Sequence, residues 1–260
     1  MYGTINGATV GKVEAIYRYP VKGLTAHALT YAQLTTGGVL PFDRAYAIEN
    51  GPGRFDESNP KTLDRIAFLM LLRDERLAAL EARFDDQDQT LTIFRSGKQV
   101  ARGNLNSTAG RAILEQFFAA YMRDELRGAP KIRHADGHSF ADASSPCVHL
   151  INLESLHDLE RVIGRPLNPL RFRPNFVVSG IEAWQEDAWV GRDIEAGSVR
   201  LQVFERTQRC AATNVDPETA SRDLDIPATL MRRWGHSNFG VYARVVDGGT
   251  VATGNAVHLV

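Results

Sequence analysis

The sequence predicts a mainly β protein with peripheral helices, in the α+β class. Three observations support this. Most apolar segments are short and alternate with polar residues, which is the pattern of half-buried strands. Glycine, proline and aspartate, which favour turns, lie between these segments. Only a few segments carry apolar residues at helical spacing. A chain of 260 residues is long enough for one large domain or two modest ones, each with its own core.

The net charge, the lack of targeting segments and the cysteine count exclude several classes of function. The net charge is −1, so no overall field attracts nucleic acid or an anionic membrane, and any anion site must be built locally. The first residues lack the basic and apolar regions of a signal peptide, and no segment approaches the length of a membrane span. Cys147 and Cys210 could pair, but two cysteines make no disulfide framework. We expect a reduced, cytoplasmic protein with no nucleic-acid or membrane partner.

The first hundred residues are predicted to be mostly strands. In the first strand, Val13, Ala15 and Tyr17 are expected to share one face. The segment 66–79 is apolar and ambiguous between helix and strand. A turn at residues 85–88 joins two strands into a hairpin. The architecture that fits is a small β-barrel or sandwich. Strands are predicted at 11–19, 28–35, 42–48, 80–84, 91–94 and 98–102.

The rest of the chain is also rich in strands but contains the predicted helices. Asn106 or Ser107 caps a helix that runs through Tyr121, and Gly164 with Pro166 ends another. Helices are predicted at 106–121, 152–163 and 226–234. Strands or extended segments are predicted at 131–134, 147–152, 170–180, 198–205, 239–246 and 251–260, with a turn and short strand at 186–191.

One cysteine stands at the end of a predicted strand. The segment 198–205 alternates apolar and polar residues and is followed by Arg206, Arg209 and Cys210. Guanidinium charge beside a thiol favours the thiolate, which is both a nucleophile and a metal ligand. The alternative is that Cys210 is a small buried apolar residue, as many free cysteines are.

Other polar residues also suggest a binding site. Arg173 and Asn175 lie on one side of the chain if their segment is extended, and together they offer donors to a phosphate or a heteroaromatic ring. Lys22 lies at a strand-to-turn junction and Arg44 at a strand start. Each could instead be an ordinary solvated or ion-paired side chain. We interpret His149 and His157 as ordinary histidines, because no third ligand is near them in sequence.

Several motifs, taken together in this order, resemble the MOSC family (molybdenum cofactor sulfurase C-terminal). The resemblance extends from Val13 to Val260, and the best-known enzyme members of this family are the mitochondrial amidoxime-reducing component and its bacterial relatives. The motifs are Tyr17-Arg18-Tyr19-Pro20-Val21-Lys22, Asp43-Arg44, Phe172-Arg173-Pro174-Asn175, Cys210 followed by Val215-Asp216-Pro217, and Phe239-Gly240-Val241-Tyr242.

The resemblance implies a fold, a cofactor and site residues. It implies a MOSC N-terminal β-barrel domain in residues 1–104 and a β-barrel MOSC domain with helical elements in residues 105–260. A molybdenum cofactor (Mo-molybdopterin) would lie at their junction. Cys210 aligns with the molybdenum-ligating cysteine. Gln208 and Gly23 stand where the relatives usually or often have Ser. The implied cofactor-binding residues are Lys22, Arg44, Ser144, Ser145, Arg173, Asn175, Gln208, Arg209 and Tyr242.

The implied activity is an oxidoreductase that reduces N-hydroxylated small molecules. Cys210 and Asp216 are the implied catalytic residues, with Asp216 relaying a proton or contacting substrate, although capping a turn before Pro217 is an equally good role for it. Because the chain has no cysteine cluster and no flavin or nucleotide motif, a separate protein would have to donate the electrons. Two alternatives remain. One is a carrier of the cofactor or its sulfur without turnover, and the other is a metal-free nucleophile or persulfide carrier at Cys210.

Overall fold

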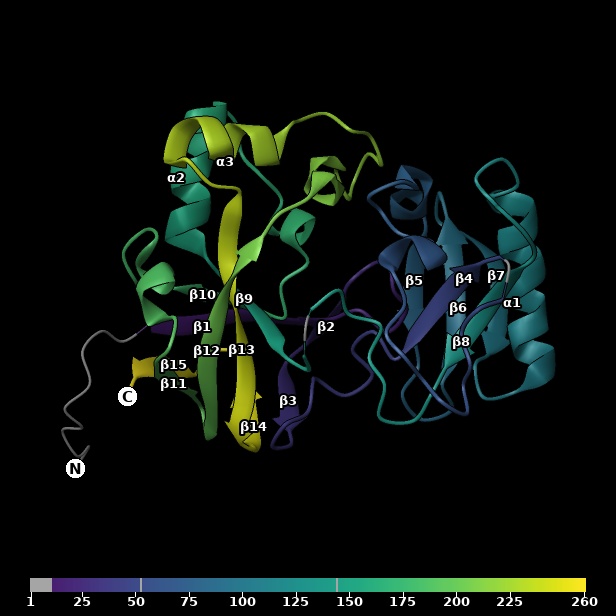
Figure 1. The fold of residues 1–260 in the computed structure, drawn as a ribbon, viewed down its shortest axis with the longest axis horizontal. Coiled ribbons are helices and arrows are strands. Elements are labelled where there is room, and N and C mark those ends of the chain that lie inside the picture. The colour runs from purple at the N-terminus through teal and green to yellow at the C-terminus, as the bar shows by residue number, and fades with distance from the viewer. Residues whose placement is uncertain (1–10, 52, 144) are drawn as a thin grey trace.

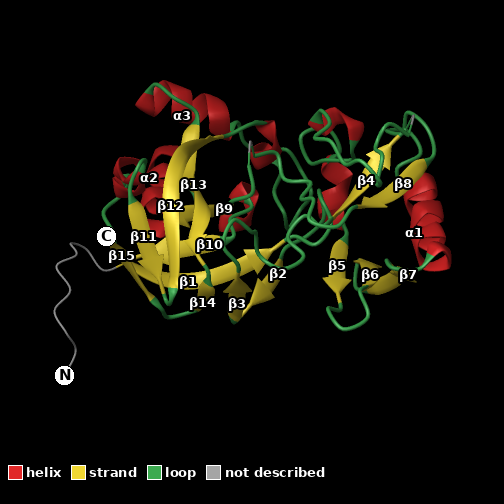
Figure 2. Ribbon diagram, turned by 60° about the horizontal axis from the view of Figure 1, so that its bottom comes forward, coloured by secondary structure: helices red, strands yellow, loops and turns green. Residues whose placement is uncertain are grey.

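The largest sheet closes into a barrel. The computed structural model describes residues 11–51, 53–143 and 145–260. Seven strands follow one another in the order β10-β9-β13-β12-β11-β15-β1, and β10 also pairs with β1, which completes the ring (Figure 2). β2 extends the sheet beyond β1. The predicted class, mainly strands with peripheral helices, is confirmed.

The elements have the following bounds. The helices are α1 (Thr108–Tyr121), α2 (Leu153–Ile163) and α3 (Ile226–Trp234). Short 3₁₀ helices are η1 (Arg65–Ala67), η2 (Glu75–Ala79), η3 (Pro169–Phe172), η4 (Gln185–Trp189) and η5 (Ala211–Asn214). The strands are β1 (Gly11–Arg18), β2 (His27–Leu29), β3 (Tyr31–Leu34), β4 (Tyr46–Asn50), β5 (Glu81–Phe84), β6 (Thr90–Arg95), β7 (Lys98–Asn104), β8 (Pro130–His134), β9 (Val148–Asn152), β10 (Phe176–Ser179), β11 (Asp193–Ala196), β12 (Val199–Gln208), β13 (Asn238–Asp247), β14 (Gly249–Ala252) and β15 (Ala256–Leu259).

The barrel interior is packed with aliphatic side chains from alternate strand positions. In β12, Val199, Leu201 and Val203 are fully buried, as their alternation with polar neighbours predicts. Helices α2 and α3 cover the outside of this barrel (Figure 1), where a separate apolar cluster forms beneath them. We call β1–β3, β9–β15, α2 and α3 the barrel group.

The remaining elements form a second compact group. Strands β5, β6 and β7 make an antiparallel sheet, β4 pairs with β8, and α1 packs against β7 and β8. Figure 1 shows this α1 group, defined as β4–β8 with α1, beside the barrel group. It has its own core, which includes Leu91, Ile93, Leu114 and Phe118. None of the helices in the described residues is long and apolar enough to cross a membrane.

The two groups do not separate at residue 104. Strands β1–β3 precede this position but pair with β10, β14 and β15, whereas α1 and β8 follow it and pack on β4–β7. The division into residues 1–104 and 105–260 therefore stays a prediction about sequence units. In space, the chain begins in the barrel group, passes through the α1 group and returns.

All three helices begin at a side-chain cap, and two of them end at a glycine. The side chains of Ser107, Asn152 and Asp225 each accept a hydrogen bond from a backbone N–H in the first turn. Gly164 and Gly235 follow the last turns of α2 and α3 with φ of 84° and 76°, a left-handed conformation that glycine adopts without steric cost.

Some element predictions are wrong at particular residues. The predicted strand 42–48 begins only at Tyr46, because Phe42 and Arg44 have positive φ and form a turn. A bulge between Val13 and Ala15 shifts the alternation in β1, so Val13 and Ile16 face the barrel interior. Residues 185–189 form a 3₁₀ helix instead of the predicted turn and short strand. Two predicted strands, 28–35 and 251–260, are each divided into two.

Candidate functional site

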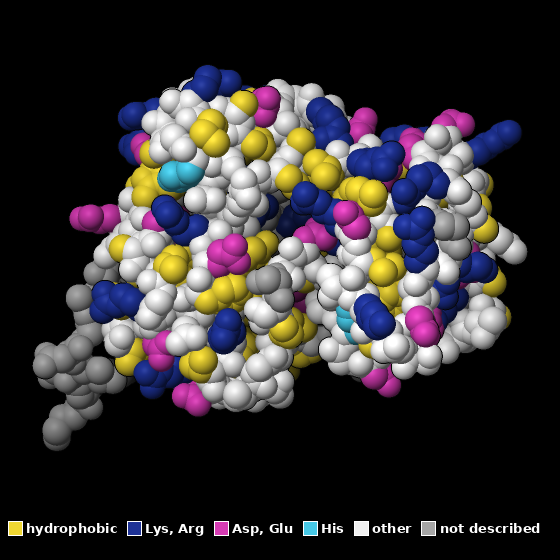
Figure 3. Space-filling model, in the orientation of Figure 1, with side chains coloured by type: hydrophobic (Ala, Val, Ile, Leu, Met, Phe, Trp, Pro, Cys, Tyr) yellow, Lys and Arg dark blue, Asp and Glu magenta, His cyan; other side chains and the backbone are white. Residues whose placement is uncertain are grey.

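A polar cavity lies where the barrel group meets the α1 group. Its volume is about 180 Å³. Figure 3 shows Lys and Arg side chains gathered where the two groups meet. Eight of the predicted cofactor-binding or metal-binding residues line the cavity, namely Lys22, Arg44, Arg173, Asn175, Gln208, Arg209, Cys210 and Tyr242. They come from strand ends and turns that are far apart in the sequence.

Cys210 lies two residues after Gln208, the last residue of β12. Its backbone oxygen accepts hydrogen bonds from the N–H and the hydroxyl of Thr213, so the cysteine caps the 3₁₀ helix η5. The thiol is half-buried and lies in the cavity wall. Of the two arginines predicted to flank it, only Arg209 reaches the cavity. Arg206 is exposed and lies 3.6 Å from Asp187, so it belongs to a surface ion pair.

Arg173 contributes a guanidinium to the cavity wall, and its Nη2 is buried. It ends η3 with φ of 52°, and this turn directs its side chain back across the junction to Leu24, whose carbonyl accepts from Nη1 at 2.8 Å. The guanidinium carbon lies 4.0 Å from the centre of the Tyr19 ring. Burial lowers the pKa of Arg173 to about 10, so the group remains a cation at neutral pH.

Arg44 stacks on the same aromatic ring. Its guanidinium carbon is 4.4 Å from the centre of the Tyr19 ring, and Nη2 donates to the carbonyl of Arg173 at 3.2 Å. Asp43, which is buried, pairs with Arg44 and also accepts from the N–H of Tyr19. Tyr19 thus supports two cations that would otherwise repel each other in a buried site.

Arg209 fixes the state of a neighbouring histidine. Its Nη2 donates to the carbonyl of Phe172 at 2.7 Å, and its Nη1 lies 3.3 Å from His149 Nε2. A guanidinium can only donate, so Nε2 must accept and the ring proton sits on Nδ1, which faces the carbonyl of Arg173 at 3.4 Å. Burial, with the charge of Arg209, lowers the pKa of His149 well below its usual range, so the ring is neutral.

Lys22 lies at the turn that follows β1. Its Nζ donates to the carbonyl of Phe140 at 2.8 Å and to Asp142 at 2.6 Å. Burial lowers the pKa of Lys22, whereas the charge of Asp142 opposes that shift. The next residue, Gly23, has φ of 84° and packs under the backbone of Leu69, which explains a glycine at this position.

Two residues predicted to bind the cofactor, Asn175 and Ser145, differ from the prediction in their contacts or position. The amide nitrogen of Asn175 donates to the carbonyl of Tyr17, and its oxygen accepts from the N–H of His149. Asn175 therefore links β1 to β9, and its amide does not combine with Arg173 as a pair of donors for a ligand. Ser145 is not part of the cavity wall, although its buried hydroxyl has no partner within the described residues. Ser144 lies outside the described residues.

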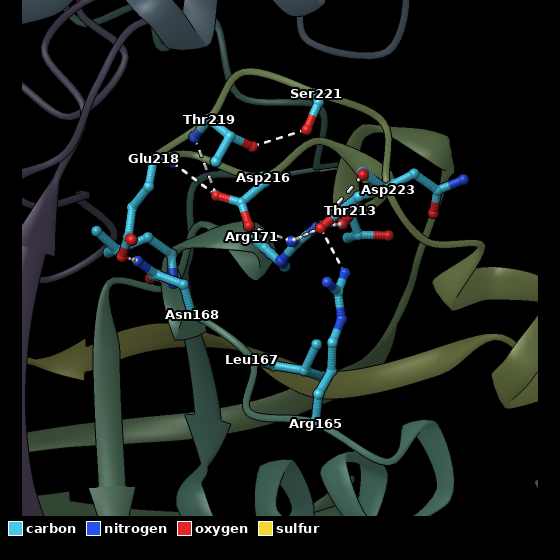
Figure 4. Close-up of polar contacts among 12 residues, drawn as sticks. Arg165, Leu167, Asn168, Arg171, Thr213, Asp216, Glu218, Thr219, Ser221 and Asp223 are labelled. Atoms are coloured by element: carbon cyan, nitrogen blue, oxygen red, sulfur yellow. Dashed lines mark hydrogen bonds and ion pairs between the residues drawn. The ribbon is translucent and has the colours of Figure 1, made fainter.

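Asp216 does not reach the cavity. One carboxylate oxygen accepts from the N–H groups of Glu218 and Thr219, which is the turn cap that the sequence allowed, and the other pairs with Arg171 (Figure 4). Arg171 also pairs with Asp223. The position of Asp216 therefore supports a structural role in the segment that follows Cys210.

Sequence reasoning missed several residues of the cavity wall. His149 was interpreted as an ordinary histidine, but it contacts Arg209 and lines the cavity. Cys147 also lines it, and burial raises the pKa of this thiol to about 12, so it stays protonated. Asp43 and Asp142 supply the balancing carboxylates. Of these residues, only Asp43 could have been found from the sequence, because it is next to Arg44 in one of the family motifs.

The cavity can hold a polar anionic group. Five cationic side chains line it against the carboxylates of Asp43 and Asp142, namely Lys22, Arg44, Arg65, Arg173 and Arg209. Arg173 Nη2 and Arg209 Nε are buried, and neither has a hydrogen-bond partner in the part of the chain that the structure describes. Because unpaired buried donors are costly, these atoms favour a ligand that carries hydrogen-bond acceptors. A pterin phosphate with a metal at Cys210 has the required acceptors.

Comparisons with known proteins show which family the chain resembles. The family profile for the MOSC N-terminal beta barrel domain matches residues 10–125, and that for the MOSC domain matches residues 136–258. Human mitochondrial amidoxime-reducing component 1 is 23% identical over 96% of this chain and 83% of its own length. Bovine molybdenum cofactor sulfurase is 25% identical over 88% of this chain.

The two relatives are covered to different extents. The chain spans only 30% of the length of the bovine sulfurase. Among solved structures, the YUAD protein from Bacillus subtilis superposes with a TM-score of 0.45 at 13% identity, over 96% of this chain and 95% of that one. The two matching domain profiles together extend over nearly all of the described residues. The chain therefore belongs to the MOSC family, with a MOSC N-terminal beta barrel domain followed by a MOSC domain.

Proposed function

We propose that this protein binds a molybdenum cofactor in the polar cavity and reduces N-hydroxylated small molecules. The observation that carries the proposal is a pair of half-buried cations, Arg173 and Arg209, beside the half-buried thiol of Cys210. Arg173 Nη2 and Arg209 Nε are buried and have no hydrogen-bond partner in the described residues. The names of the relatives, an amidoxime-reducing component and a molybdenum cofactor sulfurase, support the cofactor and the reaction class.

Different residues of the cavity would bind different parts of the cofactor. Arg44, Arg173, Arg209 and Lys22 would bind its anionic and acceptor groups, and the thiolate of Cys210 would ligate the metal. When bound, the cofactor would supply the two-electron chemistry that, with two protons, converts an N–OH group to N–H and water. His149, neutral and fixed by Arg209, would orient that guanidinium and leave the cavity positive.

The proposal includes an external electron donor. The chain has two cysteines, fewer than the four that ligate an iron–sulfur cluster, and Cys147 is held as a neutral thiol. We propose that a separate redox protein delivers the electrons. A cytoplasmic location is also part of the proposal, because a reducing compartment preserves the free thiol of Cys210.

Molybdenum content tests the proposal first. The protein would be expressed in a molybdate-fed host that makes the cofactor, and bound metal would be measured by mass spectrometry. We expect near-stoichiometric molybdenum in the wild type and a loss of about tenfold or more in Cys210→Ala, because a metal–thiolate bond is removed. Cys147→Ala is the matched control, since it removes the other thiol of the same cavity and should retain the metal.

Turnover separates the outcomes. A loaded wild type that reduces a simple amidoxime with an artificial electron donor supports the oxidoreductase. A loaded protein without turnover on any N-hydroxylated compound would instead indicate a cofactor carrier. Absence of molybdenum from the wild type, in a host where a reference molybdoenzyme loads, would contradict the proposal and leave Cys210 as a bare thiol.

A further inference from the structure

A second, larger cavity adjoins the polar one. Its volume is about 500 Å³. Four residues line both cavities: Gly23, Leu71, Arg173 and Ala212. Ala212 lies two residues after Cys210 on η5. The two cavities therefore share a wall of residues next to the thiol of Cys210.

The walls of the second cavity are mainly apolar. On one side they are formed by the turn after β1 together with β5, and on the other by η3 and the segment after η5. The apolar wall residues include Leu24, Ala78, Phe84, Leu170 and Val215. A volume of this size holds a drug-sized molecule, and apolar walls with few polar groups are typical of small-molecule sites.

The charged side chains that line this cavity have opposite partners or opposite counterparts. Arg83 pairs with Glu81, Arg173 and Glu218 bring one charge of each sign, and Arg171 belongs to a network of ion pairs. Arg171 is buried and pairs with Asp216 and Asp223, and Arg165 also pairs with Asp223 (Figure 4). Two guanidinium groups thus face two carboxylates, so the network carries no net charge toward the cavity. This differs from the polar cavity, where cations outnumber carboxylates.

One donor of that network remains unused. Arg171 lines the second cavity, and its Nε is buried with no hydrogen-bond partner in residues 11–51, 53–143 and 145–260. An unpaired buried N–H costs free energy unless a ligand or water supplies an acceptor. Since the network is electrically balanced, the acceptor that suits it is a neutral oxygen or nitrogen on an otherwise apolar molecule.

We infer that the second cavity binds the apolar body of the substrate, so that the protein prefers neutral N-hydroxylated compounds with a long alkyl or an aryl group. This rests on the proposed function for the reacting N–OH group. The apolar body would lie between β5 and η3, and the N–OH group would reach past Ala212 toward Cys210. Small polar N-hydroxylated compounds would leave the second cavity unfilled and bind weakly.

A substrate series with a cavity-filling variant tests this inference. The loaded enzyme would be assayed with acetamidoxime and with octanamidoxime. Each buried methylene favours binding, so we expect KM to fall at least about tenfold across the series in the wild type. In Ala78→Phe, which places a ring in the cavity, KM for octanamidoxime should rise at least about tenfold more than KM for acetamidoxime.

Ala79→Phe is the matched control. Ala79 is the adjacent residue of η2, is exposed, and does not line the cavity, so its variant should behave like the wild type. Ala28→Phe provides a second filling variant at an exposed position of β2 that lines the cavity. Thermal melts would establish that each variant is folded. Equal effects of the lining and control variants, or no dependence on chain length, would overturn the inference.

Binding of an unreactive probe separates this inference from the proposed reaction. Octanamide carries the same apolar chain without the N–OH group, and its binding is measured by isothermal titration calorimetry on the loaded protein. Binding to the wild type and to Ala79→Phe, lost in Ala78→Phe, would support the cavity even if no amidoxime is reduced. Failure of octanamide to bind the wild type would overturn the inference whatever the outcome of the turnover assay.

Discussion

His149 is kept neutral by its surroundings. The ring is buried, and Arg209 donates to Nε2, so a second proton would meet both desolvation and a nearby positive charge. The folded-state pKa is therefore lower than that of the unfolded chain. Below the unfolded pKa, near 6.5, the unfolded state binds a proton that the folded state rejects, and stability falls as pH falls.

The lowered pKa of His149 in the folded protein predicts how stability depends on pH. We expect the melting temperature of the wild type to fall more steeply than that of His149→Gln as pH is lowered from about 7 to about 5. His157→Gln, the same replacement at an exposed histidine of α2, is the control and should follow the wild type. Parallel curves for the wild type and His149→Gln would show that the ring does not resist protonation.

At the scale of elements, the segment after Cys210 is held by one guanidinium. Arg171 reaches the carbonyl of Asn214 at 3.3 Å and the carboxylate of Asp223 at 2.9 Å and 2.8 Å, besides its pair with Asp216. Cys210 caps the start of η5, and Asn214 is the last residue of this helix. The contacts of Arg171 therefore hold η5 in place, and with it the backbone of Cys210. Figure 4 shows Arg171 at the centre of this network.

The network predicts a structural effect for Asp216. In Asp216→Asn the turn cap can remain while the charge is lost, so we expect a decrease in unfolding free energy of about 1–2 kcal/mol. Asp216→Ala also loses the cap and should be destabilised by about 1 kcal/mol more. Urea unfolding measures both. We expect kcat per folded, molybdenum-loaded protein to stay near that of the wild type. A fall in kcat of about a hundredfold without destabilisation would restore the catalytic role predicted from the sequence.

At the scale of the whole molecule, Arg222 links the two groups of elements beside the cavity. Its Nη2 donates to the carbonyls of Leu71 and Leu72, each at 2.8 Å, and its Nη1 donates to the carbonyl of Ala211 at 2.9 Å. Nε also contacts Glu75 at 3.2 Å. The segment before η2 and the start of η5, which both border the cavity, are thereby fixed to each other.

Removal of this link should loosen the junction without unfolding the protein. In Arg222→Ala we expect faster hydrogen exchange in residues 69–75 and 211–214, and a loss of stability of about 1 kcal/mol because the side chain is partly exposed. Arg232→Ala, on the surface of α3, is the control. Mass spectrometry of exchanged peptides measures the effect. Unchanged exchange in both segments would show that other contacts hold the two groups together.

Features that depend on near neighbours could be predicted from the sequence. The alternation of Val199, Leu201 and Val203 identified β12 and placed Cys210 at its end, and Ser107 and Asn152 located two helix starts. Periodicity and capping act over a few residues, so the chain carries them locally. The family resemblance added further cavity residues, such as Gln208 and Tyr242, because a motif brings together positions whose spatial proximity no local pattern shows.

Contacts between distant segments were decided only by the tertiary structure. Closure of the barrel requires β1 to pair with β10, and Arg173 reaches Leu24 across 149 residues of sequence. This packing alone brought His149 to Arg209, moved Asp216 out of the cavity and created the second cavity. Such contacts depend on how the whole core is filled, and the same local pattern is compatible with many partners. The strands and the position of the Cys210 thiol therefore follow from the sequence, whereas the charge, shape and neighbours of the site follow from the closed fold.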